Sequence, residues 1–159
     1  MANKFSKGEF TPTNWDKYMG DRSRPIIYRS SWEYTVMRTF DQHPNVVGWA
    51  SEPLEIPYQN PMTGRWTVYV PDFMVVYLDK NGKNHSEMIE VKPMKERPAM
   101  WRPVAFQNMK MRLTEVLQAK HQINHAKWVA ATRFCLKRGM TFRLASEDQL
   151  FATTAGRPK

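Results

Sequence analysis

Two acidic residues and a lysine fall at one end of a predicted β-hairpin, where they could bind a metal ion. Asp72 stands just before an apolar run at residues 73–78, and Glu90 and Lys92 alternate with apolar residues farther along the chain. In an antiparallel pair the start of the first strand lies beside the end of the second, so Asp72 should come close to Glu90 and Lys92. Carboxylate oxygens suit hard divalent ions, which activate water for hydrolysis. The spacing therefore predicts a hard-metal site at this edge of the hairpin.

Each of these residues also has a simpler interpretation. An aspartate that follows a proline, as Asp72 does, is frequent in turns, and Glu90 with Lys92 could form only the solvent-facing side of a half-buried strand. A third carboxylate, Glu33, could reach the same edge from the first predicted helix. Ser30 and Glu33 equally match a capping box, in which the glutamate accepts a hydrogen bond from the main-chain N–H of the cap residue, Ser30. The sequence leaves both interpretations of Glu33 open.

The hairpin that would hold the charged residues has clear sequence signals. Residues 73–78 (FMVVYL) have the length and composition of a buried strand. Residues 79–82 (DKNG) contain Asn-Gly, which supplies the positive φ angles that tight hairpin turns need. The chain returns through residues 88–92, where the period of two places Glu90 and Lys92 on one face and the apolar residues on the other.

Helices and further strands are expected around this hairpin. Apolar residues at helical spacing predict a helix over residues 31–42, and Pro44 ends it. The order of elements predicts an α/β fold with a mixed central sheet flanked by helices. Residues 65–70 alternate as a strand does, with Trp66, Val68 and Val70 on one face and Thr67 and Tyr69 on the other. The remaining predicted elements are a strand at 50–58, helices at 104–120 and 122–138 with Gly139 as the C-cap, a strand at 140–145 and a short helix from Ser146.

The charge balance favours a polyanionic partner. The chain has 24 Lys and Arg against 15 Asp and Glu, a net charge of +9, which points first to nucleic acid and otherwise to a basic surface that serves solubility. No apolar run is long enough to span a membrane, and one cysteine, Cys135, excludes an intramolecular disulfide. The candidate DNA contacts are Lys95, Arg97, Arg102, Asn124 and Lys127. Asn124 and Lys127 could alternatively belong to a solvated helix face.

Taken together, these pieces resemble a known superfamily of nucleases. Glu33 on the first helix, Pro71-Asp72 before a strand and Glu90-Val91-Lys92 on the next match the PD-(D/E)xK pattern. Residues 28–58 and 127–147 look like the TnsA-type endonuclease branch of that superfamily. The order along the whole chain is similar to the nucleases that complete the heads of T-even-type tailed phages. The resemblance implies a restriction-endonuclease-like core, with a nuclease domain at 28–150. Residues 1–27 contain Gly, Pro, Asn and scattered Lys with little periodicity, so we expect an extended basic arm there, and a loose tail at 151–159.

The resemblance also implies a role for each residue of the motif. Asp72 and Glu90 would ligate a divalent ion, Mg²⁺ with Mn²⁺ able to substitute, helped by the Val91 carbonyl. Glu33 would complete the ligand shell directly or through water. Lys92 would sit beside the attacking water or the scissile phosphate and offset the developing charge. The product would carry a 5′-phosphate.

The implied function is endonucleolytic cleavage of double-stranded DNA during phage head completion. The protein would process or secure packaged DNA ends before the tail joins, with portal, neck or head proteins as partners and no membrane. It would act in the host cytoplasm during assembly and in the virion head or neck; the oligomeric state is left open. Alternatives are a structural DNA-end or neck protein, a TnsA-like subunit that cleaves transposon ends, and a DNA-binding module without catalysis.

Overall fold

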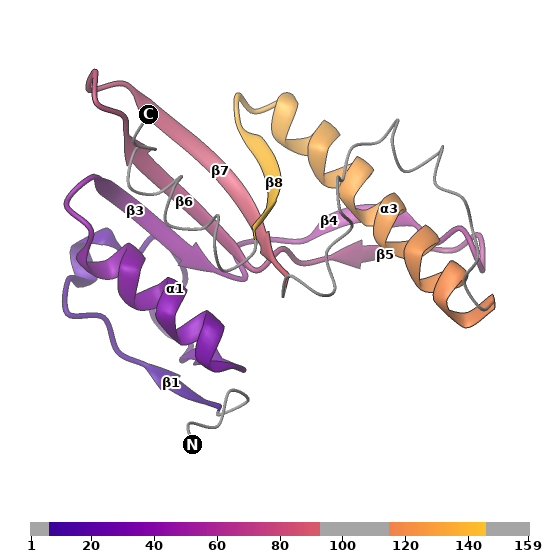
Figure 1. Cartoon of the computed structure of the whole chain (residues 1–159), viewed down its shortest axis with the longest axis horizontal. Coiled ribbons are helices and arrows are strands. Elements are labelled where there is room, and N and C mark those ends of the chain that lie inside the picture. The colour runs from indigo at the N-terminus through magenta and orange to yellow at the C-terminus, as the bar shows by residue number, and fades with distance from the viewer. Residues whose placement is uncertain (1–6, 93–114, 146–159) are drawn as a thin grey trace.

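A mixed four-stranded sheet forms the centre of the fold. The computed structural model describes residues 7–92 and 115–145, with side chains of the second range from residue 119 (Figure 1). The strands lie in the order β3-β6-β7-β8; β7 and β8 are parallel, whereas the other neighbours are antiparallel. The predicted α/β class with a mixed central sheet is confirmed. The strands are β3 (Val46–Ser51), β6 (Phe73–Leu78), β7 (Asn84–Val91) and β8 (Thr141–Ala145).

Helix α1 (Ser31–Gln42) and the N-terminal residues cover one face of this sheet. The bounds of α1 match the prediction. Trp49 of β3 is fully buried, and its ring lies 4.8 Å from that of Tyr18 and 6.1 Å from that of Phe40. Because aromatic rings bury large apolar areas, this cluster supplies much of the hydrophobic stabilisation of this face. Tyr18, which is buried in this cluster, thus anchors the N-terminal segment to the sheet.

The N-terminal residues are tied to the domain by main-chain contacts as well. Strand β1 (Gly8–Phe10) pairs with β2 (Ile26–Tyr28) across the expected boundary at residue 27, and a 3₁₀ turn spans Trp15–Lys17. The carboxylate of Asp41, which is 1% exposed, accepts hydrogen bonds from the main-chain N–H groups of Thr13 at 3.0 Å and Asn14 at 2.9 Å. A buried carboxylate needs such partners because desolvation is otherwise costly. Residues 8–28 therefore pack as part of the folded domain.

The opposite face of the sheet is covered by helix α3 (Glu115–Leu136) and the hairpin of β4 (Ile56–Gln59) and β5 (Trp66–Tyr69). Figure 1 shows α3 running alongside this hairpin. Residues 115–136 form one continuous helix, so the predicted interruption between 120 and 122 is wrong. Gly139 has a φ of 71° and ends the helix as predicted, with the Met140 N–H donating to the Cys135 carbonyl at 2.9 Å.

Two strand predictions in this region are corrected. A single strand at 50–58 is wrong, because β3 ends at Ser51 and Glu52 adopts a φ of 47° before β4 begins. Residues of β5 alternate between two faces as predicted, but the apolar face of the predicted strand, with Trp66, Val68 and Val70, is exposed rather than buried. Trp66 is 69% exposed, whereas Tyr69 is 5% exposed and packs with α3.

The β6–β7 hairpin forms with a longer return strand than predicted. β7 begins at Asn84, and the antiparallel register aligns Phe73 with Ile89. Only Gly82 of the turn has a positive φ, at 80°, so the expected pair of positive φ angles at Asn-Gly is wrong. The turn is closed instead by hydrogen bonds to the carboxylate of Asp79 from the main-chain N–H groups of Asn81 at 2.8 Å and of residue 83 at 3.0 Å.

Several predictions lie outside the described residues. These are residues 104–114 of the first expected late helix, the short helix from Ser146 and the tail at 151–159. Neither α1 nor α3 combines the length and the apolar composition that crossing a bilayer would need.

Candidate active site

Asp72 lies at the start of β6, directly beside the end of β7. One oxygen of its carboxylate accepts a hydrogen bond from the Val91 N–H at 2.8 Å. The Asp72 carbonyl accepts a second bond from the Glu52 N–H at 2.9 Å, which joins β6 to the end of β3. The predicted proximity of Asp72 to the end of the return strand is therefore confirmed. Because both bonds involve main-chain groups of neighbouring strands, Asp72 is held rigidly.

Glu90 and Lys92 converge on the same edge. The Lys92 ammonium lies 3.9 Å from one carboxylate oxygen of Glu90, and both side chains are mostly buried, with 20% and 15% exposed respectively. The main-chain N–H of Lys92 donates to the Ala145 carbonyl at 2.9 Å, so β8 fixes the backbone that carries the lysine. The alternative of an open solvent-facing strand does not fit this burial.

Tyr69 holds the other oxygen of the Glu90 carboxylate. Its hydroxyl donates to Glu90 across 2.6 Å, a length typical of a charge-assisted O–H···O⁻ bond. Burial, together with the negative charge of Glu90, raises the pKa of Tyr69 far above its usual range, so the phenol keeps its proton and remains a donor. Sequence reasoning missed this role. The available signal was the β5 alternation, which separates Tyr69 from the exposed Trp66.

The two carboxylates sit in an electrostatically unfavourable place. Burial raises the pKa of Asp72 well above its usual range, and the negative charge of Glu90 raises it further. The hydrogen bond from the Val91 N–H and the positive charge of Lys92 lower this pKa but only partly offset the rise. Burial likewise raises the pKa of Glu90, although the Tyr69 hydrogen bond and the charges of Lys92 and Lys127 counteract it. Two buried carboxylates with incomplete compensation favour an added cation. The donor set, carboxylate oxygens on rigid strands, fits a hard divalent ion.

Glu33 forms one half of the predicted capping box. Its main-chain N–H donates to the hydroxyl of the cap residue Ser30 at 3.2 Å, whereas its carboxylate accepts from the N–H of Arg29, one residue before the cap, at 3.0 Å. The Glu33 charge still raises the pKa of both Asp72 and Glu90. Within residues 7–92 and 115–145, no three His, Cys, Asp or Glu side chains are grouped closely enough to hold a metal ion. Ligation by Glu33 therefore stays a prediction.

Positive charges border the site on two sides. Lys127 of α3 lies with its ammonium 5.8 Å from the centroid of the Tyr69 ring. Arg29 forms an ion pair with Glu52, and the hydrogen bond to Glu52, together with the charges of Glu52, Glu33 and Asp72, raises the pKa of Arg29. Asn124 is half-buried on α3, three residues before Lys127. Of the other candidate DNA contacts, Lys95, Arg97 and Arg102 lie outside the described residues.

Comparisons with known proteins agree with this geometry. Residues 43–147 match the family described as TnsA-like endonuclease N terminal, a range that contains Asp72, Glu90 and Lys92 and begins after Glu33. The chain is also 34% identical over 146 residues to the head completion nuclease of Enterobacteria phage T4, covering 91% of this chain and 93% of that protein. The mixed sheet is accordingly the restriction-endonuclease-like core expected from the sequence. This chain belongs to the TnsA-like endonuclease family.

Proposed function

We propose that this protein is a Mg²⁺-dependent DNA endonuclease that hydrolyses phosphodiester bonds. The observation that carries the proposal is the meeting of Asp72, Glu90 and Lys92 at one rigid edge of the sheet, with Glu90 held by Tyr69. Two carboxylates and an ammonium in this arrangement suit hydrolysis of a phosphate ester. Membership of an endonuclease family supports the same reaction.

The residues of the site have distinct roles in this reaction. Asp72 and Glu90, with the Val91 carbonyl and Glu33, would hold Mg²⁺, or Mn²⁺ in its place. When bound, the ion would supply Lewis acidity at the scissile phosphate. Lys92 would orient the attacking water and offset negative charge that develops on the phosphate oxygens. The Tyr69 hydroxyl leaves Glu90 one oxygen for the ion and fixes the direction of that oxygen.

The biological setting we propose is completion of a phage head. The similarity to a protein named as a head completion nuclease extends over 91% of this chain, which supports a shared role. The substrate would be double-stranded DNA whose packaged ends are processed or secured before tail joining, next to portal, neck or head proteins. The net charge of +9 suits contacts to the DNA backbone without dependence on sequence. Action in the host cytoplasm, and in the virion head or neck, follows from this setting.

A plasmid-cleavage assay tests the proposed reaction. Supercoiled and linear DNA are incubated with the full-length protein and Mg²⁺, Mn²⁺ or a chelator. Wild-type protein should nick or cut only with metal, and Asp72→Ala, Glu90→Ala and Lys92→Ala should each lose about 100-fold or more in rate. Glu55→Ala, which changes an exposed acid outside the site, serves as the control. Equal cleavage by wild-type protein and the three site variants would contradict the assignment.

The biological role is tested separately by complementation. Phage that lack this gene product are supplied with wild-type protein or Glu90→Ala, and infectious particles are counted. We expect Glu90→Ala to fail while its protein level stays normal. Full rescue by Glu90→Ala would instead indicate a structural role at the DNA end.

A further inference from the structure

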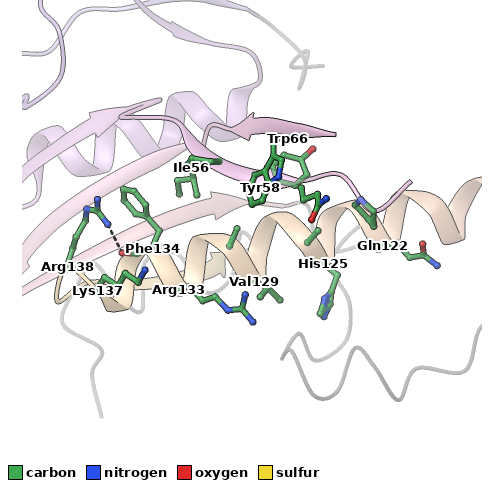
Figure 2. A pocket seen from close by; sticks show the side chains of 15 residues that line it. Ile56, Tyr58, Trp66, Gln122, His125, Val129, Arg133, Phe134, Lys137 and Arg138 are labelled. Carbon is green, nitrogen blue, oxygen red and sulfur yellow. Dashed lines mark hydrogen bonds between the residues drawn. The ribbon is translucent and has the colours of Figure 1, made fainter. Parts of the chain in front are cut away.

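A large groove runs between α3 and the β4–β5 hairpin (Figure 2). Its volume is about 1160 Å³. Small-molecule sites usually enclose roughly 300–1,000 Å³, so the groove is large enough for a segment of a polymer. Its floor is apolar and includes Ile56 of β4 and Val129 of α3.

Aromatic side chains stand at several points of this groove. On the hairpin side, Trp66, which is 69% exposed, and the buried Tyr58 both line the groove (Figure 2). On the α3 side the guanidinium of Arg138 covers the Phe134 ring at 3.6 Å from its centroid. Exposed aromatic faces and planar arginine groups are the surfaces on which unpaired nucleobases stack.

The charged side chains of the groove are all basic. Arg133, Lys137 and Arg138 line it and are exposed, and the described residues that line it include no Asp or Glu. Arg133 and Lys137 are four residues apart on α3, where like charges repel each other. A phosphate backbone lying along the groove would relieve this repulsion, so the groove is complementary to a polyanion.

The groove and the active site share two elements, β5 and α3. Tyr69, which holds Glu90, belongs to the same strand as Trp66. Lys127, which lies by the Tyr69 ring, precedes the groove residue Arg133 on α3. The same two elements therefore carry residues of the active site and residues of the groove.

We infer that this groove binds single-stranded DNA, the unpaired strand next to the scissile phosphate. Stacking requires bases whose faces are free, and only an unpaired strand offers them. The inference rests on the proposed function for the identity of the ligand as DNA. It adds a substrate class: duplexes with a frayed or single-stranded extension should be bound more tightly than blunt duplexes.

Fluorescence anisotropy with the full-length protein tests the inference. The probe is labelled oligothymidylate of about 12 nucleotides, within the roughly 4–16 nucleotides that such grooves span. A chelator prevents cleavage. Trp66→Ala should weaken binding by about 5- to 100-fold, the range expected for loss of one stacked base. Arg133→Gln with Lys137→Gln should lower the slope of log affinity against log salt by about 1.4, because each phosphate contact contributes about 0.7.

The control variant removes two charges elsewhere. Lys80→Gln with Lys83→Gln, both exposed at the β6–β7 turn, should leave affinity and salt slope close to wild type. Circular dichroism checks that every variant is folded. Unchanged oligothymidylate affinity in both groove variants would overturn the inference, as would an equal loss in the turn variant.

Glu90→Ala separates this inference from the proposed function. It should bind oligothymidylate like wild type while it fails to cleave plasmid. If Glu90→Ala cleaves normally but the groove variants lose binding, the proposed catalytic site fails and the groove inference stands. If Glu90→Ala is inactive but the groove variants bind oligothymidylate normally, the proposed catalytic site stands and the groove inference fails.

Discussion

Replacing Tyr69 with phenylalanine removes one hydroxyl from the site and keeps the ring. The lost bond runs to the buried carboxylate of Glu90 over 2.6 Å. Hydrogen bonds to charged groups contribute about 1.5–3 kcal/mol, and about 1.4 kcal/mol corresponds to a factor of ten. Partners that orient metal ligands have a similar effect of roughly 10–100-fold. Tyr69→Phe should therefore reduce Mg²⁺-dependent cleavage by about 10- to 100-fold.

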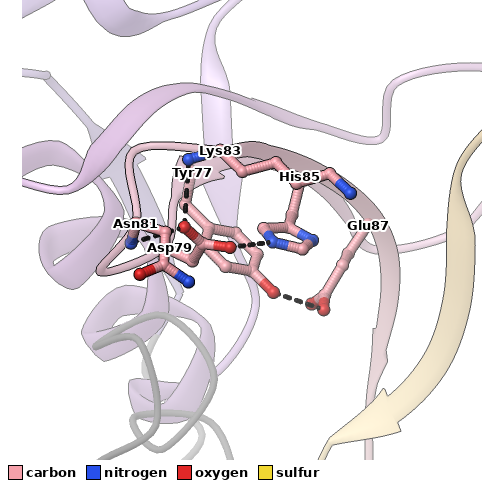
Figure 3. Close-up of polar contacts among 6 residues, drawn as sticks. All are labelled: Tyr77, Asp79, Asn81, Lys83, His85 and Glu87. Atoms are coloured by element: carbon pink, nitrogen blue, oxygen red, sulfur yellow. Dashed lines mark hydrogen bonds and ion pairs between the residues drawn. The ribbon is translucent and has the colours of Figure 1, made fainter.

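The same structure offers a matched control at the other end of β6. The Tyr77 hydroxyl donates to Glu87 at 2.9 Å, a buried tyrosine–glutamate bond far along the strand from the site (Figure 3). Tyr77→Phe should cost a similar free energy of unfolding, about 1–3 kcal/mol, but leave cleavage near wild type. Plasmid cleavage is measured over a range of Mg²⁺ concentrations, at a temperature well below the unfolding midpoints of both variants. The free energy of unfolding is measured by urea denaturation. Equal activity losses in the two variants would refute the argument, because they would indicate general destabilisation.

Three further outcomes follow from residues outside the site. Asp41→Ala should destabilise the fold by about 2–6 kcal/mol, because it leaves the main-chain N–H groups of Thr13 and Asn14 without an acceptor, at about 1–3 kcal/mol each. Limited proteolysis should then cut first within the N-terminal segment. Hydrogen bonding to His85 and to main-chain N–H groups of the turn lowers the pKa of Asp79 to about 2. The ionised Asp79 carboxylate thus stabilises the fold above about pH 4, and this stabilisation is lost as the pH falls through 2. The difference in melting temperature between wild type and Asp79→Asn should therefore shrink between about pH 4 and pH 2. Burial raises the pKa of Cys135 to about 11, and alkylation with iodoacetamide at pH 8 should be slow until the protein is denatured.

The part of the site that sequence reasoning predicts is the part built by local pairing. Asp72, Glu90 and Lys92 lie on two consecutive strands, and a turn signal with alternation is enough to set which residues meet. The burial of Tyr69 depends instead on which side of β5 packs against α3. That choice comes from long-range packing, and on β5 it buries Tyr69 and exposes Trp66, the opposite of what hydrophobicity indicates.

Backbone details were missed for a related reason. The break after β3 rests on the positive φ of Glu52, whose N–H donates to Asp72 and whose carboxylate pairs with Arg29. None of these contacts is visible in the local sequence. Helix α3 was divided in two although its sequence contains no Pro or Gly between Glu115 and Leu136. The absence of a breaker was the better guide.

The hydrogen bond between Lys92 and Ala145 has a consequence for the time at which the site appears during synthesis. The ribosome produces Asp72, Glu90 and Lys92 well before it produces α3 and β8. Yet the backbone of Lys92 is fixed by the last described strand, and Tyr69 is buried by the helix before it. A polypeptide interrupted before β8 thus contains the charged residues of a nuclease without the geometry that positions them.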